Sequence, residues 1–160
     1  LRSLDLIIDR KVIFIPRLHP TLLSGDEFKK LAHSGNKLVV NAYDLNLDEL
    51  FINSSLVVGE WGTTGMYTSA LFGVPGIMCL FPDDTVSRSA LYPDGIPPLL
   101  IAGAGWGAEN PSQLRERIQW IFSHKEEAEA QVCEKVRVFA PLLEAGASER
   151  IAKVIEEFLL

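Results

Sequence analysis

The sequence predicts an α/β domain in which helices cover both faces of a parallel sheet. Apolar runs of strand length alternate along the chain with segments of helical periodicity. The runs are apolar throughout rather than alternating with polar residues, which is typical of strands buried between two helical layers. A chain of 160 residues can bury one sizeable core, so we expect residues 1–160 to form a single domain.

Two strands and a helix are expected at the start of the chain. The run KVIFIP predicts a strand over 11–16 that ends at a proline. SGDEFKKLAHSG predicts a short helix, with Ser24 as its cap, Glu27 three residues later and Gly35 at its end. The next apolar run, KLVVNA, predicts a strand over 37–41.

Two helices and two strands are expected in the middle of the chain. DLNLDELFINS carries Leu47, Leu50 and Phe51 at the i, i+3 and i+4 positions of one helical face. SLVVGEW predicts a strand near 55–60, TTGMYTSALFG a helix, and VPGIMCLF a strand near 75–81. We expect the four strands named so far to join one parallel sheet.

The segment after the fourth strand is less regular. IPPLLIAG is a candidate strand, which Pro97 and Pro98 would confine to a sheet edge. GAGWGA at 103–108 is expected to be a loop, with Trp106 a candidate for lining a cleft. Its glycines do not directly join a strand to a helix, so the dinucleotide fingerprint is not met.

The last third of the chain is expected to be helical. Asn110 can cap the first helix, Pro111 suits its first turn, and an apolar stripe follows it. The stripe consists of Leu114, Ile118 and Ile121. Pro141 and Gly146 then separate this tract from a terminal helix, SERIAKVIEEFLL.

Composition narrows the possible partners. The chain has 15 lysine and arginine residues against 21 aspartate and glutamate residues, a formal net charge of −6. A broad basic face for DNA or RNA is therefore not expected. No run of about 18 apolar residues occurs, so no transmembrane segment is expected. The spacing of Cys79 and Cys133, and of three scattered histidines, predicts no metal cofactor and a reduced, cytoplasmic protein.

The turn GEWGTTG is the main candidate for a binding site. It lies where the strand near 55–60 passes into a helix, and ligands of open α/β sheets sit at such carboxyl ends. Gly62 and Gly65 would bring backbone N–H groups close to a ligand, and Thr63 and Thr64 would add hydroxyls. This pattern is typical of a phosphate cradle, although Thr63 as a simple helix cap would explain the same residues.

Arg17 and His19, in RLHP at the end of the first strand, would face the same rim of a parallel sheet. Arginine can hold an anion with two parallel hydrogen bonds, and histidine can donate to a phosphate oxygen. A surface arginine and a locally bonded histidine are the alternative interpretation.

Further candidates on this rim are Asp83 and Asp84, which could contact sugar hydroxyls, and Arg88, which could bind an anion. Trp61 is either a core residue or a platform for a ring. His33 and His124 are expected at the surface.

In order along the chain, RLHP, NLDELFINS, SLVVGEWGTT and ALFGVPGI resemble the C-terminal half of GT-B glycosyltransferases. The similarity continues through GIPPLLIAGAGWGAENPSQLRERIQWIF to the closing helix, and non-hydrolysing UDP-N-acetylglucosamine 2-epimerases share the architecture. The resemblance implies a Rossmann-like three-layer α/β/α domain that binds a nucleotide-activated sugar or a related donor. It implies an N-terminal partner domain, so this chain, which begins at Leu1, is interpreted as part of a longer protein and as inactive alone. Tag removal or proteolysis would give the same start.

Two family patterns can be compared with this chain. Many retaining members have two glutamates separated by seven residues; Glu60 stands at the first place, and Thr68 at the second. The loss of a carboxylate that usually holds ribose hydroxyls favours a non-catalytic phosphate-binding or interaction domain as the alternative function. The His-Pro and Ser/Thr elements of bacterial sialyltransferases and glycerophosphate transferases are similar to His19-Pro20 and Thr63-Thr64, which the resemblance implies are phosphate contacts.

Overall fold

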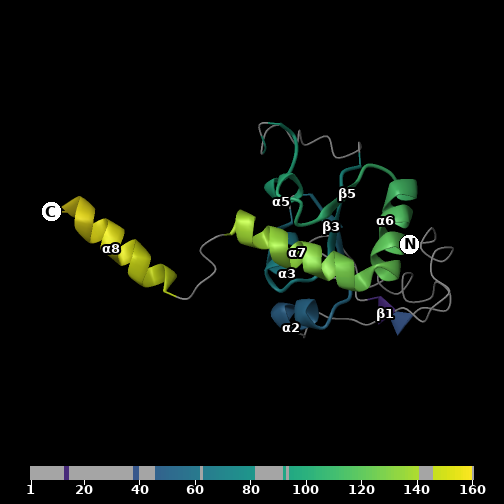
Figure 1. The fold of residues 1–160 in the computed structure, drawn as a ribbon, viewed down its shortest axis with the longest axis horizontal. Coiled ribbons are helices and arrows are strands. Elements are labelled where there is room, and N and C mark those ends of the chain that lie inside the picture. Colours follow the sequence, from purple (N-terminus) through teal and green to yellow (C-terminus); the bar gives the residue numbers. More distant parts are fainter. Residues whose placement is uncertain are drawn as a thin grey trace, which may run out of the picture.

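A computed structural model describes residues 13–14, 38–39, 46–61, 63–81, 92, 94–140 and 146–159. Its elements, in chain order, are β1 (Ile13–Phe14), β2 (Leu38–Val39), α2 (Leu47–Ile52), β3 (Val57–Glu60), α3 (Thr64–Leu71), β4 (Gly76–Cys79), α5 (Pro98–Ile101), β5 (Trp106–Ala108), α6 (Pro111–Ser123), α7 (Lys125–Phe139) and α8 (Ala147–Leu159). Figure 1 shows their arrangement.

All strand pairs among the described residues are parallel. β1 pairs with β2, with Ile13 opposite Leu38, and β3, β4 and β5 form a second sheet in that order. In the second sheet Val57 lies opposite Gly76, and Ile77 lies opposite Trp106. The described strands thus form two sheets, where the sequence predicted one, and the parallel pairing itself is confirmed.

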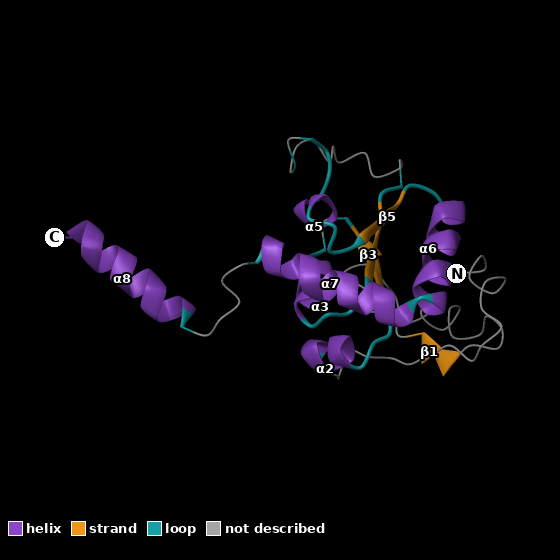
Figure 2. Ribbon diagram, viewed as in Figure 1, coloured by secondary structure: helices purple, strands orange, loops and turns teal. Residues whose placement is uncertain are grey.

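Helices cover both faces of the three-stranded sheet (Figure 2). On one face Met78 packs with Met66 of α3 and Val132 of α7. On the other face Ile77 packs with Ile118 of α6. Because successive residues of a strand point to opposite faces, β4 supplies both cores. The predicted α/β architecture, with helices on both sides of a parallel sheet, is confirmed for this part of the chain.

Two glycines let α3 pack closely against the sheet. A Cβ atom at Gly59 would lie 2.9 Å from Sδ of Met66, and one at Gly76 would lie 2.6 Å from its Cε. Met66 is fully buried over these two positions. The bare backbone of β3 and β4 therefore sets how near the start of α3 lies to the sheet.

Residues 98–101 form a helix, so the expected edge strand in IPPLLIAG is wrong. The N–H groups of Leu100 and Ile101 donate to the Pro97 carbonyl over 2.9 and 3.2 Å. Pro98 is the first helical residue, where its fixed φ fits and its missing N–H breaks no hydrogen bond. The prolines that would suit a sheet edge suit a helix start equally well.

Residues 106–108 form β5, so the loop expected over 103–108 is wrong at these positions. A Cβ at Gly107 would lie 3.1 Å from Leu80 Cδ1 and 3.2 Å from Leu100 Cδ1. Glycine thus fits beneath two core leucines, and pairing with β4 outweighs its weak strand propensity. Trp106 is half-buried and packs against both cores.

The helical signals after β5 are confirmed. The Gln113 N–H donates to Asn110 Oδ1 over 3.0 Å, and the Glu109 N–H donates to Gln113 Oε1 over 2.8 Å. Pro111 begins α6, whose Ile118 and Ile121 are buried. The tract consists of two helices, because His124 leaves the helical conformation between α6 and α7, with φ −127° and ψ 45°.

The terminal helix α8 stands apart from the body of the domain (Figure 1). Gly146, with φ 95°, precedes it, and the Arg150 N–H donates to the Gly146 carbonyl over 3.0 Å. Its apolar residues Ile151, Val154 and Ile155 are exposed. Neither α8 nor any other described helix has the length and apolar character needed to cross a membrane.

Candidate functional site

The turn between β3 and α3 leaves exposed donors at the start of the helix. Thr63 has the extended conformation of a helix cap, but its side chain makes no capping hydrogen bond. Its own N–H closes the turn by donating to the Glu60 carbonyl over 3.2 Å. No described residue accepts from the N–H groups of Thr64 and Gly65. Since Thr63 and Thr64 are exposed, two hydroxyls and two backbone donors are open to an anion.

The first turn of α3 carries no side chain that would repel an anion. The first turn of α3 contains no acidic residue, whereas α2 begins with Asp48 and Glu49 and α7 with Glu126 and Glu127. Helix starts carry a partial positive charge of about half a proton, which acidic residues normally offset. Among the described helices of at least eight residues, α3 is the one that has neither a side-chain cap nor an acidic first turn.

Gly65 has a packing role of its own. A Cβ atom there would lie 3.1 Å from Cζ of Phe51, the buried residue of α2. Its φ is not positive, so the backbone does not itself require glycine. Contact between α2 and α3 therefore explains Gly65 whether or not an anion binds.

Glu60 and Thr68 lie at the two ends of this region. Glu60 is exposed at the last position of β3. The Thr68 hydroxyl donates to the Thr64 carbonyl over 3.4 Å, a bond within its own helix. In this conformation the Thr68 hydroxyl therefore donates its proton within α3, and its oxygen can still accept a hydrogen bond.

The other half of the expected site lies outside the described residues. Arg17, His19 and Gly62 belong to that part of the chain, as do Asp83, Asp84 and Arg88. Of the expected site residues, the structure describes Glu60, Thr63, Thr64, Gly65 and Thr68, all within one strand–turn–helix segment.

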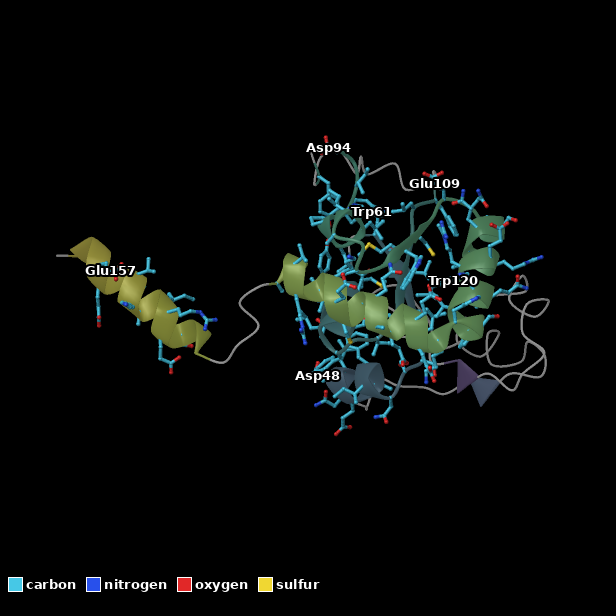
Figure 3. The ribbon with its side chains drawn as sticks, viewed as in Figure 1. Asp48, Trp61, Asp94, Glu109, Trp120 and Glu157 are labelled. Atoms are coloured by element: carbon cyan, nitrogen blue, oxygen red, sulfur yellow. The ribbon has the colours of Figure 1, made fainter. Side chains whose placement is uncertain are left out.

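Trp61 is a core residue and not an open platform. Its side chain is 6% exposed and packs with Leu99 of α5 and Leu80. Figure 3 shows Trp61 inside the body of the domain. Tyr92 meets it edge-on, with ring centroids 6.1 Å apart at 74°. The buried Trp61 ring therefore fixes the start of the turn to the core, and the exposed donors follow it.

A tyrosine pair beside this anchor was not expected from the sequence. The hydroxyl oxygens of Tyr67 and Tyr92 lie 3.3 Å apart. Burial, and then the hydrogen bond to Tyr92, raise the pKa of Tyr67 well above its ordinary value. The two residues are 25 positions apart in the chain. No local spacing signals such a contact.

A second cluster of aromatic side chains lies at the C-terminal end of α6. Trp120 packs between Trp106, with centroids 5.7 Å apart, and His124, whose ring stacks on it at 5.1 Å. The exposed His124 agrees with the expected surface position. Within the described ranges, no group of three or more histidine, cysteine, aspartate or glutamate residues could hold a metal ion.

Comparison of the chain with protein-family models, with curated proteins and with solved structures finds no match to any of them. The functional interpretation therefore depends on the residues of the chain itself.

Proposed function

We propose that this chain is the Rossmann-like donor-binding domain of a GT-B-type glycosyltransferase and that it binds a nucleotide-activated sugar or a related donor. The observation that carries the proposal is the uncapped start of α3. There the hydroxyls of Thr63 and Thr64 and the N–H groups of Thr64 and Gly65 are open at the carboxyl end of a parallel strand. Donor diphosphates carry the charge that such a group of donors prefers.

The chemistry that this site supplies is stabilisation of a departing nucleotide phosphate. Negative charge grows on that phosphate as the bond to the sugar breaks, and fixed donors gain strength as it grows. In the proposal Arg17 and His19 add charge-assisted hydrogen bonds from the neighbouring strand end. The acceptor and its base belong to a second domain, so this chain alone binds donor without transferring the sugar.

A second candidate is a phosphate-binding domain without transferase chemistry, or half of a sugar-nucleotide 2-epimerase. The position of Thr68 favours the non-catalytic candidate. Its hydroxyl is bonded to the Thr64 carbonyl, and it has no carboxylate to hold two ribose hydroxyls. The two candidates differ in whether the ribose contributes to binding.

Calorimetric titration of CMP, CDP and UDP tests the anion site. The double variant Thr63→Ala/Thr64→Ala should bind about tenfold or more weakly, because hydrogen bonds to a charged group contribute about 1.5–3 kcal/mol each. Ser112→Ala on α6, also an exposed hydroxyl near a helix start, is the matched control and should leave binding unchanged. Equal heats from the double variant and the unaltered chain, or no binding by the unaltered chain, would contradict the proposal.

Inorganic pyrophosphate separates the two candidates. A donor-binding domain should bind CDP or UDP more tightly than pyrophosphate, because the nucleoside adds contacts. A domain that recognises phosphate alone should bind all three equally. Thr68→Ala adds a second readout, since a loss of nucleotide affinity without a loss of pyrophosphate affinity would place Thr68 at the ribose.

A further inference from the structure

Arg115, in the second turn of α6, has a buried nitrogen atom without a hydrogen-bond partner. Its side chain is half-buried, and its Nε is shielded from solvent. Among the described side chains, this Nε is the only buried nitrogen or oxygen for which the structure shows no partner. An unsatisfied buried donor is costly, and most so when it is charged. The Arg115 guanidinium therefore needs an acceptor that the described residues do not provide.

The acidic residues of the described ranges do not pair with Arg115. Glu116, its neighbour in the chain, is exposed and accepts from Ser112 Oγ over 3.5 Å. The ion pairs of Lys125 and Lys135 lie within α7. The chain has 21 acidic residues against 15 basic ones, so a half-buried arginine that pairs with none of the described carboxylates is unusual. Such an arginine is a candidate for binding an anion from outside the chain.

α6 begins at the edge of the sheet where the parallel strands end. β5 ends at Ala108, and α6 begins at Pro111. Because β3, β4 and β5 are parallel, β3 passes into the turn before α3 at this same edge, which we call the carboxyl edge. Figure 3 shows Glu109, just after β5, and Trp61, just after β3, toward the same upper side of the domain. Helical side chains tilt toward the start of their helix, so that of Arg115 extends toward the carboxyl edge.

The helical period places Arg115 on the side of α6 that faces β3. Trp120 contacts Trp106 of the outer strand β5, with ring centroids 5.7 Å apart. Arg115 lies on the opposite flank of the buried stripe of α6. On this face of the sheet Val58 of β3 is 44% exposed, whereas Ile77 beside it in β4 is buried. Arg115 thus borders the part of this face that α6 leaves exposed.

We propose that Arg115 is an anion-binding residue of the carboxyl edge and that its ligand is a phosphate group. The Nε–H and Nη–H groups of arginine form a planar fork that matches two oxygens of one phosphate. A bound phosphate gives the buried Nε its acceptor and balances the guanidinium charge. α3 packs on the other face of the sheet from α6, so this contact does not depend on the proposed donor binding.

The Nε–Hε signal of Arg115 in heteronuclear NMR reports this contact directly. The signal is assigned in the unaltered 160-residue chain by its loss in Arg115→Lys. Inorganic phosphate should move the signal downfield, and the movement should saturate, because a charged acceptor shortens the hydrogen bond. Arg117, which is exposed on the same helix, is the internal control, and its signal should not respond.

Two substitutions separate the guanidinium fork from its charge. In calorimetric titrations, Arg115→Gln should bind phosphate about tenfold or more weakly, because charge-assisted hydrogen bonds are lost. Arg115→Lys keeps the charge without the fork and should recover only part of this loss. Arg117→Gln makes the same charge change at an exposed position and should leave the affinity unchanged.

CDP distinguishes two sources of the phosphate group. If CDP moves the Arg115 signal at lower concentration than inorganic phosphate does, and Thr63→Ala/Thr64→Ala removes this difference, the phosphate belongs to a nucleotide that also binds the turn before α3. If both ligands act alike and the double variant changes neither response, Arg115 recognises a phosphate group alone. Both results support the phosphate contact, and only the first also supports donor binding at the turn.

Two results would overturn the proposal. One is an Arg115 signal that neither inorganic phosphate nor CDP moves, because Nε would then bond within the chain. The other is an equal loss of phosphate affinity in Arg115→Gln and Arg117→Gln, which would show that the anion responds to the general charge of α6 and not to the fork of Arg115.

Discussion

Gly73 fixes the join between α3 and β4 through a single backbone conformation. Its φ is 75°, and its N–H donates to the Ala70 carbonyl over 2.9 Å. The Val74 N–H donates to the Ser69 carbonyl over 3.0 Å, which completes a Schellman motif. A Cβ at Gly73 would also lie 2.7 Å from Sγ of Cys133. The GVP sequence is thus structural: glycine ends the helix and Pro75 leads into the strand.

Gly73→Ala should lower the free energy of unfolding by about 2–4 kcal/mol, since it combines backbone strain with a clash. Cys133→Ala in the same chain should recover the part due to the clash. Gly95→Ala is the matched control: its φ is 65°, with no atom within 4 Å of an added Cβ. Urea denaturation measures all of these variants, and equal losses at Gly73 and Gly95 would show that the contact with Cys133 costs nothing.

Because of Tyr67, the free energy of unfolding should depend on pH in the alkaline range. Burial raises its pKa in the folded chain, so the folded state disfavours the phenolate relative to the unfolded state. The stability that the protonated Tyr67 contributes is fully present below about pH 10, the pKa of tyrosine in the unfolded chain. It is lost as the pH rises beyond that value towards the raised pKa of the folded state. The stability difference between the unaltered chain and Tyr67→Phe should therefore change above pH 10, to the disadvantage of the unaltered chain. A constant difference across that range, measured by denaturation at each pH, would rule this out.

At the scale of elements, the structure shows what short sequence signals can and cannot specify. The Asn110 cap and the apolar stripe of α6 depend on neighbours within a few residues, so the sequence predicted them correctly. β5 depends on pairing with β4, about 30 residues earlier in the chain. It also depends on the absence of a side chain at Gly107, which leaves room for Leu80. The contact between Tyr67 and Tyr92 is likewise set by tertiary packing, so no local pattern predicted it. The proposed anion site is intermediate: the sequence singled out its residues, but the missing side-chain cap at Thr63 is visible only in three dimensions.

The start of α6 gives a prediction for a single element. Asn110→Ala removes the acceptor for the Gln113 N–H and should lower the free energy of unfolding by about 0.5–2 kcal/mol. The buried Ile118 and Ile121 tie α6 to the sheet, so this loss should appear in global unfolding and not only as fraying. Ser112→Ala, two residues later, should change stability little, because its 3.5 Å contact with Glu116 is exposed. Comparable losses in the two variants would argue against a specific cap.

At the scale of the whole molecule, binding should stabilise the fold. A nucleotide at one hundred times its dissociation constant adds about 2.7 kcal/mol to the free energy of unfolding. For a chain of this size, that corresponds to a rise in Tm of about 5–10 °C. Differential scanning fluorimetry with CDP or UDP should show the rise in the unaltered chain and a much smaller one in Thr63→Ala/Thr64→Ala. The same rise in both would place the nucleotide elsewhere.

Helix α7 connects the two cores. Ala128, near its start, packs with Ile77 and Ile118 on one face of the sheet, whereas Val132 and Val136 pack with Met66 and Met78 on the other. One helix therefore contributes residues to both hydrophobic cores, which the sheet otherwise separates. If α7 detaches, both layers lose contacts in the same event, so we expect the three-stranded sheet and the helices on its two faces to unfold as one cooperative unit.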